Sequence, residues 1–271
     1  MADVNRIIDI RGFLIDLDGV LYTGIRSVPG AKETLRILDK NGYPYRFISN
    51  STRRCRMSIA KKLRDLGFVI EPSSIITPAM AAAKHLRERE KRSCILLSTG
   101  DVHLDFEVEG ISMDDPHADT VVIADAGDNF TYARMNEAFR RVLGGAELMA
   151  LEKDRFWMGS DGLMLSAGPF VAALEFATGR ESSLIGKPAR EFFLRGAEEL
   201  GLDPGVIAMV GDDLQSDVGG SHRAGMRGIL VRTGKYREED LRNSSVVPDL
   251  VIDSIASLPS SLQIGDRLRP T

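Results

Sequence analysis

The sequence predicts an α/β protein: a Rossmann-like, doubly wound parallel-sheet core that carries an inserted α/β cap domain. Short apolar runs alternate with helical segments along most of the 271 residues, which is the pattern of a parallel sheet with helices on both faces. Three apolar runs end directly on polar clusters, and functional groups of such sheets gather at the carboxyl ends of strands. The alternation also starts afresh after Thr77-Pro78, which indicates a second α/β unit.

The core is predicted from elements on either side of this second unit. Gly12–Leu17 is an apolar run that closes on Asp-x-Asp-Gly, which is typical of a buried parallel strand followed by a loop. Leu35 and Leu38 share one face of a helix that Asn41-Gly42 would end. The other core elements are predicted as strands at 45–48, 74–77, 184–185, 206–210, 228–231 and 249–252 and as helices at 29–41, 55–66, 190–200 and 217–224.

The cap is predicted between these two parts of the core. Its expected elements are helices at 79–91, 132–143 and 170–178 and strands at 94–97, 120–124 and 147–151. We assign residues 1–78 and 184–271 to the core and residues 79–183 to the cap, an insertion large enough to bury a core of its own. The two crossings, near Thr77-Pro78 and near Gly179–Ser183, would form a hinge.

Two aspartates follow the first strand. Asp16 and Asp18 are two positions apart, so both side chains would point to one side of an extended strand, roughly 6 to 7 Å apart. The two carboxylates would repel each other without a cation, and Mg²⁺ favours such oxygen ligands together with a substrate phosphate. Gly19 would allow a turn that brings backbone N–H groups to an anion. An ordinary Asp-Gly turn is the alternative interpretation.

Polar residues also follow two other strands. Ser49 and Asn50 offer a hydroxyl and an amide to a phosphoryl oxygen, although a serine before a helix is also a common N-cap. Lys187 lies between Gly186 and Pro188, where its ammonium group would neutralise a phosphoryl group. A lone lysine is more commonly a surface residue, so this interpretation depends on the other strand-end residues.

Three further acids follow strand 206–210, namely Asp212, Asp213 and Asp217. Carboxylates in this position are costly without a cation or a basic partner. A metal-site role and an N-cap role for helix 217–224 stay equally open for Asp217.

Composition argues against several classes of partner. The net charge is −4 and the pI about 5.7, so we expect no bulk attraction to nucleic acid or an anionic membrane. No segment has the roughly 20 apolar residues of a membrane helix, no signal-peptide pattern is evident, and both cysteines are expected to be free thiols, so we expect a cytoplasmic protein. The basic residues between Arg53 and Arg64 are expected on a solvated helix face, with attraction of an anionic substrate as the alternative.

Four segments resemble, in order, the sequence motifs of the haloacid dehalogenase (HAD) superfamily: Phe13–Leu21, Ile48–Asn50, Gly186–Pro188 and Gly211–Asp217. The long interval between the second and third motifs resembles the branch with a large α/β cap, the NagD-like and 4-nitrophenyl-phosphatase-like group. The stretch from Asp161 to Tyr236 is most similar to the phospholysine phosphohistidine inorganic pyrophosphate phosphatase and its relatives. The resemblance covers nearly the whole chain.

This resemblance implies catalytic roles for five residues. Asp16 would be the nucleophile that attacks phosphorus. Asp18 would protonate the leaving oxygen and then activate water. Ser49 would hold the phosphoryl group with Asn50 beside it, and Lys187 would stabilise the charge. Covalent catalysis of this kind divides one displacement into two easier ones.

The resemblance also implies a Mg²⁺ site. Its ligands would be Asp16, Asp18 through the backbone carbonyl, and Asp212. Asp217 would position the water around the metal, and Asp213 would support either task.

The implied activity is Mg²⁺-dependent hydrolysis of a small phosphomonoester through a phosphorylated Asp16. A phosphotransferase or mutase that uses the same intermediate is the alternative. A binding protein without activity would be expected to lack Asp16, Asp18, Lys187 or Asp212, and all four are present.

The expected partner is a small phosphorylated metabolite, with neither nucleic acid nor membrane, and association of copies through the cap stays open. Specificity is expected in the cap loop 153–161, which carries Lys153, Arg155 and Trp157. An ordinary turn is the alternative there.

Overall fold

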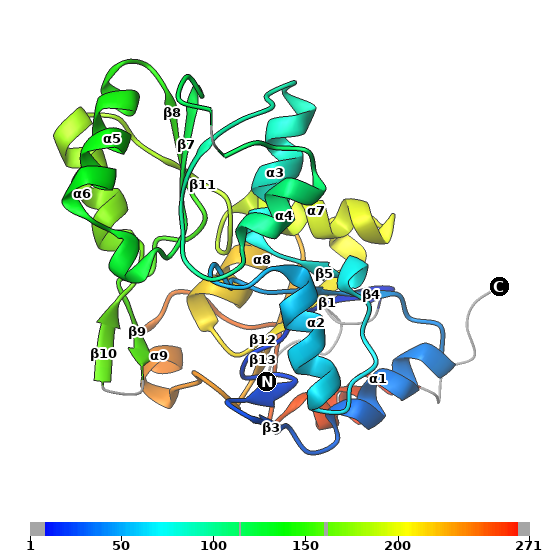
Figure 1. The fold of residues 1–271 in the computed structure, drawn as a ribbon. Coiled ribbons are helices and arrows are strands. Elements are labelled where there is room, and N and C mark those ends of the chain that lie inside the picture. Colours follow the sequence, from blue (N-terminus) through cyan, green and yellow to red (C-terminus); the bar gives the residue numbers. More distant parts are fainter. Residues whose placement is uncertain (1–8, 114, 160–161, 265–271) are drawn as a thin grey trace. The chain divides into compact units, whose positions relative to one another are not determined.

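The chain forms two compact units in the computed structural model, which describes residues 9–113, 115–159 and 162–264 (Figure 1). The first unit comprises the chain up to Ser49, Lys62–Ile76 and the chain from Pro188 onward. The second comprises Asn50–Lys61 and Thr77–Lys187.

The first unit contains a six-stranded sheet in the order β14-β13-β12-β1-β4-β5, and every neighbouring pair is parallel. From β1 the chain proceeds outward to β4 and β5 and later returns to β12 on the other side of β1, so the order reverses beside β1. Ligands of open α/β sheets bind at such a reversal, beyond the carboxyl ends of the strands. The strands are β1 (Gly12–Asp16), β4 (Tyr45–Ile48), β5 (Ile75–Ile76), β12 (Ile207–Gly211), β13 (Arg227–Val231) and β14 (Leu250–Ile252).

Apolar faces of helices cover this sheet. Helix α1 buries Leu35 and Leu38, and α7 buries Phe192 and Phe193. A small hairpin of β2 (Tyr22–Thr23) and β3 (Arg26–Ser27) follows β1. The helices are α1 (Ala31–Lys40), α7 (Arg190–Leu200), a π-helix at Leu214–Gly219, α8 (Gly220–Arg223), α9 (Glu238–Asn243) and α10 (Leu258–Ser261), while α2 (Arg56–Asp65) contains the boundary between the units.

The second unit has its own parallel sheet, in the order β11-β8-β7-β6. Val121 and Ile123 pack with α5 and α6 on one face, and Val122 packs with α3 and α4 on the other, which is the alternation expected of a strand covered on both sides. The elements are α3 (Pro78–Glu88), β6 (Ile95–Leu97), α4 (His103–Val108), β7 (Thr120–Ile123), α5 (Tyr132–Leu143), β8 (Glu147–Ala150), α6 (Gly168–Thr178) and β11 (Ser183–Leu184).

An antiparallel hairpin of β9 (Phe156–Gly159) and β10 (Gly162–Leu165) completes the second unit (Figure 1). The prediction of a loop at 153–161 is therefore wrong for β9, where Trp157 pairs with Met164 across the hairpin. Asp161, the last residue of that loop, lies outside the described residues.

The predicted α/β class with parallel sheets is confirmed, and the bounds predicted for β4, α5 and α7 agree with the structure. One strand belongs elsewhere than predicted. Leu184 pairs with Ala150 in the sheet of the second unit, so the strand predicted at 184–185 is not part of the core sheet. The second unit also includes Asn50–Lys61 and extends to Lys187, and its role as a cap domain stays a prediction.

Two predictions concern the environment of the chain. Among the described residues, we find no helix with the length and apolar character needed to cross a bilayer. Cys55 and Cys94 are both buried and form no disulfide, as predicted.

Candidate active site

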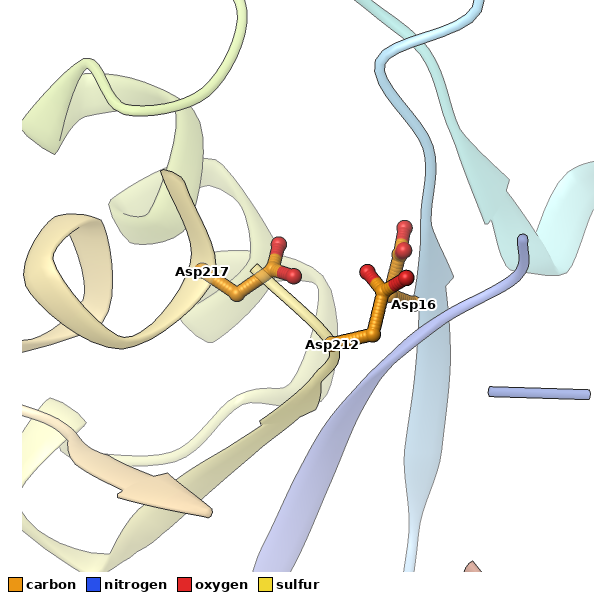
Figure 2. Close-up of side chains that lie close together, drawn as sticks. All are labelled: Asp16, Asp212 and Asp217. Atoms are coloured by element: carbon orange, nitrogen blue, oxygen red, sulfur yellow. The ribbon is translucent and has the colours of Figure 1, made fainter. Parts of the chain in front are cut away.

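Three aspartates converge beyond the carboxyl ends of β1 and β12. Asp16 is the last residue of β1, Asp212 follows β12, and Asp217 comes from the π-helix after it. Each offers a carboxylate oxygen, and these oxygens lie within 4.8 Å of one another. Figure 2 shows the Asp217 carboxylate turned toward those of Asp16 and Asp212. All three side chains are buried, and Asp217 has no exposed surface at all.

The register of the two strands brings these residues together. Ile15 lies opposite Val210 in the parallel pair of β1 and β12, so Asp16 and the residues after Val210 reach the same edge of the sheet. Every residue of both strands is buried, and carboxylates held at the end of such strands repel one another unless a cation or a basic side chain lies beside them. A set of three carboxylate oxygens fits Mg²⁺, which prefers hard oxygen ligands.

Two glycines let the backbone approach these carboxylates closely. Gly19 has φ +82°, and a Cβ at this position would overlap the carboxylate of Asp212. A Cβ at Gly211 would overlap the side chain of Asp217. The loop after β1 and the end of β12 therefore have room for the acids only because both residues lack a side chain.

Asp213 and Asp217 divide the two roles that the sequence left open. The carboxylate of Asp213 caps the π-helix by accepting hydrogen bonds from the backbone N–H groups of Gln215 (3.0 Å) and Ser216 (2.8 Å). Asp217 lies inside that helix and accepts a bond from the Asp213 N–H at 3.1 Å. The N-cap interpretation of Asp217 is therefore wrong, and its carboxylate belongs to the acidic group. A π-bulge of this kind is common at functional sites.

Asp18 lies apart from the three buried acids. It is exposed, and among the residues that the structure describes its carboxylate is not a member of that group. It precedes a tight turn in which the Gly19 N–H donates to the carbonyl of Tyr22 at 2.7 Å. The metal role that the sequence assigns to Asp18 concerns its backbone carbonyl, and this role stays a prediction.

Ser49 follows β4 in the first unit. Its N–H donates to the carbonyl of Ile76 at 3.0 Å, and its side chain is buried. This continues the ladder between β4 and β5 by one residue and fixes Ser49 at the carboxyl edge of the sheet.

Asn50 and Lys187 form a pair within the second unit. The Lys187 N–H donates to Asn50 Oδ1 at 2.9 Å, and Asn50 Nδ2 donates back to the Lys187 carbonyl at 3.3 Å. A Cβ at Gly186 would overlap Asn50 Oδ1, so the glycine before Lys187 makes room for this amide. Lys187 is buried, which is exceptional for a lysine.

Two basic residues, Arg53 just before α2 and Arg56 at its start, are engaged within the second unit. Arg53 pairs with Asp125 at 2.9 Å and Arg56 with Asp105 at 3.2 Å, and both aspartates are buried. The prediction of a solvated face is therefore wrong for Arg56, whose side chain is only 14% exposed, whereas the Arg53 side chain keeps 39% exposure. Asp101 and Asp105 accept the N–H groups at the start of the helix, from Cys55 and Arg56.

Comparison with known proteins shows the family to which the chain is related. A family model described as "Haloacid dehalogenase-like hydrolase" matches residues 13–112, and a second model of HAD-like hydrolases matches residues 184–258. The chain is 40% identical over 245 residues to haloacid dehalogenase-like hydrolase domain-containing protein 2 of Bos taurus, which covers 90% of this chain and 93% of that protein.

Two further relatives carry names of activities. Phospholysine phosphohistidine inorganic pyrophosphate phosphatase of Bos taurus is 37% identical over 93% of this chain and 94% of its own length. The crystal structure of a 4-nitrophenylphosphatase from Thermotoga maritima superposes with a TM-score of 0.89 at 29% identity, over 95% of this chain and 99% of that one. The chain belongs to the haloacid dehalogenase-like hydrolases, as the four motifs predicted.

Proposed function

We propose that this hydrolase is a Mg²⁺-dependent phosphatase that cleaves a small phosphomonoester through a phosphorylated Asp16. The observation that carries the proposal is the group of three buried carboxylates, from Asp16, Asp212 and Asp217, within 4.8 Å. The names of two relatives, a phospholysine phosphohistidine inorganic pyrophosphate phosphatase and a 4-nitrophenylphosphatase, support the same class of reaction.

The chemistry proceeds in two displacements. An oxygen of Asp16 attacks phosphorus, the bond from phosphorus to the leaving oxygen breaks, and Asp18 donates a proton to that oxygen. Asp18 then takes a proton from water as the water attacks the phosphorylated Asp16, which releases inorganic phosphate and restores the carboxylate. The exposure of Asp18 suits a group that must exchange protons with both a leaving group and water.

The remaining site residues neutralise the charge of the phosphate and hold it in position. Asp16, Asp212 and Asp217 would hold the metal ion, with the backbone carbonyl of Asp18 as a further ligand. The ion would neutralise charge on the phosphate and allow a carboxylate nucleophile to approach it. Lys187 adds positive charge for the same purpose, and Ser49 donates a hydrogen bond to the phosphoryl group.

In this proposal the second unit acts as a cap domain and determines which substrates are hydrolysed. Its strand β9 carries the only tryptophan of the sequence and lies in the segment 153–161, to which we assign specificity. The substrate is a small phosphorylated metabolite, and a cytoplasmic setting suits two buried, unpaired thiols.

A phosphotransferase or mutase is the second candidate because Asp16 chemistry is shared up to the phosphorylated state. A screen of phosphorylated metabolites with Mg²⁺ in H₂¹⁸O separates the two. A phosphatase releases inorganic phosphate that contains one ¹⁸O per turnover, whereas a transferase moves unlabelled phosphate to an acceptor. Absence of phosphate release from every compound would overturn the phosphatase proposal.

A further inference from the structure

The loop after β13 touches both halves of the acidic site. Strand β13 lies next to β12 in the sheet, and the chain then turns through Thr233, Gly234 and Lys235. Thr233 Oγ1 donates a hydrogen bond to the carbonyl of Gly19. The Lys235 N–H donates to Asp212 Oδ2 at 2.7 Å. The loop is thus bonded both to the turn after the Asp16 strand and to the acid after β12.

We propose that the segment Thr233–Lys235 positions the metal site by holding the Asp212 carboxylate and the Gly19 turn in one fixed arrangement. This inference rests on the proposed function, because it assigns the segment a role toward the metal ion of that site. None of its three residues touches substrate in this account, so they are positioning residues.

The strongest evidence is the lack of space at Gly234. Its φ is +67°, a Cβ added to it would overlap Asp212 Oδ2, and the same Cβ would lie 2.5 Å from the Cα of Gly19. Gly19 itself has φ +82° and would overlap the same carboxylate with a Cβ of its own. Two glycines from distant parts of the chain therefore enclose one carboxylate, and a side chain on either would displace it.

The hydrogen bond from the Lys235 N–H fixes the orientation of the Asp212 carboxylate. A backbone N–H on Oδ2 fixes the rotation about the bond that joins the carboxylate to its Cβ, so the ligand does not need to be ordered when a metal binds. Asp212 is only 3% exposed, whereas Gly234 and Lys235 are exposed on their other side. The segment therefore covers the acid from the solvent side.

The bond from Thr233 acts on the other half of the site. Gly19 is the residue after Asp18. Its carbonyl accepts the hydrogen bond from Thr233, and its N–H donates to the carbonyl of Tyr22. Hydrogen bonds at both backbone groups of Gly19 limit the movement of the Asp18 carbonyl, which shares a peptide group with the Gly19 N–H and which the proposed function assigns to the metal.

Binding of Mg²⁺ alone to the purified full chain, followed by isothermal titration calorimetry, tests this role. Gly234→Ala should weaken binding by about tenfold or more, and Thr233→Val should weaken it by up to about tenfold, the range typical of groups that orient metal ligands. Thr233→Ser keeps the hydroxyl and should bind as the wild type does. The Mg²⁺ concentration for half-maximal hydrolysis of 4-nitrophenyl phosphate should rise most for Gly234→Ala, less for Thr233→Val and not at all for Thr233→Ser.

Gly201→Ala is the matched control. Gly201 has φ +65°, close to that of Gly234, but a Cβ there meets nothing within 4 Å. It therefore introduces the same backbone strain, and a similar loss of thermal stability, far from any carboxylate of the site. Its affinity for Mg²⁺ should equal that of the wild type.

The outcomes separate this inference from the proposed function. Wild-type affinity in both Gly234→Ala and Thr233→Val, or an equal loss in Gly201→Ala, would overturn the positioning role while the phosphatase proposal stands. A wild-type chain that neither binds Mg²⁺ nor hydrolyses a phosphate ester would overturn the proposed function itself, and the inference with it.

Discussion

The carboxamide of Asn50 makes hydrogen bonds to both backbone groups of Lys187: the lysine N–H donates to Oδ1 at 2.9 Å, and Nδ2 donates to the lysine carbonyl at 3.3 Å. The two residues are 137 positions apart in the sequence. An amide can satisfy both groups because it carries a donor and an acceptor. The geometry gives Asn50 a role that the sequence did not suggest, since it fixes the backbone from which the lysine side chain extends.

Asn50→Ala should therefore lower kcat by about 10- to 100-fold by releasing Lys187, with little effect on the fold. The double variant Asn50→Ala/Lys187→Ala tests the route of this effect. If Asn50 acts through the lysine, the double variant should be no slower than Lys187→Ala alone, because coupled residues are not additive. Additive losses in kcat would instead indicate that Asn50 binds the phosphoryl group directly.

Much of the core site could be predicted because it depends on local patterns. Asp16 and Asp212 each follow a short buried apolar run, and parallel strands bring their carboxyl ends to one edge of a sheet. The bounds of β4, α5 and α7 were predictable for the same reason, since apolar spacing and flanking glycines are local signals.

The errors arise from contacts between distant residues. Arg53 and Arg56 are bound by Asp125 and Asp105, which are 72 and 49 positions away, so no local pattern distinguishes them from solvated arginines. Strand β11 is two residues long and is defined by its pairing with β8. The π-helix could not be predicted from the sequence either, because Asp217 resembles an N-cap until the hydrogen bonds of Asp213 are known.

Asp16→Asn should abolish turnover, with a loss in kcat of about 10³-fold or more, because an amide is a poor nucleophile. The substitution also removes one charge from a crowded group, so the metal-free variant should melt about 2–4 °C above the wild type. Steady-state kinetics and a melting curve in EDTA measure both effects. Mass spectrometry must exclude deamidation to Asp, and more than a few per cent of residual activity would then refute the nucleophile assignment.

Chelation should stop turnover reversibly. Three buried carboxylates within 4.8 Å and a phosphate dianion repel one another unless a cation lies between them. Activity should vanish in EDTA and return with excess Mg²⁺, while Ca²⁺ should inhibit, because its higher and looser coordination would let it bind both oxygens of Asp16. Full turnover after exhaustive chelation would exclude the proposed metal site.

Glu152 closes the base of the β9–β10 hairpin. Its buried carboxylate accepts hydrogen bonds from Ser166 Oγ at 2.6 Å and from the Ala167 N–H at 2.8 Å, and it also contacts the Asp154 N–H. Residues on both sides of the hairpin are thus bound to one side chain. Burial nevertheless raises the pKa of Glu152 above its ordinary value of 4.5, because the charged form is poorly solvated there.

This shift predicts a pH-dependent stability. A raised folded-state pKa means that the folded chain binds the proton more tightly, so the contribution of Glu152 is fully present below pH 4.5 and is lost as the pH rises through the raised value. Glu152→Gln does not titrate. The melting temperature of the wild type minus that of Glu152→Gln should therefore be larger at pH 4.5 than at pH 8. A difference that is constant across this range, or that grows with pH, would contradict the assignment.

Trp157 in the hairpin contacts a basic side chain of the same unit. The guanidinium of Arg53 lies 4.7 Å from the centre of its ring, and that guanidinium is itself fixed by two hydrogen bonds to Asp125. A cation over an indole face contributes roughly 0.5 to 2 kcal/mol. This contact fixes the position of the indole ring within the second unit, and the specificity role of the segment stays a prediction with the ordinary turn as its alternative.

Trp157→Ala should consequently change the order of preference among phosphorylated substrates while hydrolysis of 4-nitrophenyl phosphate persists. Asp16 and Asp18, which carry out the two displacements in the proposed mechanism, belong to the first unit, so a small generic ester needs little from the hairpin, whereas a larger leaving group depends on it. Met158→Ala is the matched control, because the neighbouring side chain projects from the opposite face of the strand and is 71% exposed. The measurement is kcat/KM for a panel of esters, and we expect ratios between substrates to shift by about tenfold or more for Trp157→Ala and to stay constant for Met158→Ala. If Trp157→Ala scales every kcat/KM by the same factor, the hairpin is not the specificity element and the segment is an ordinary connection.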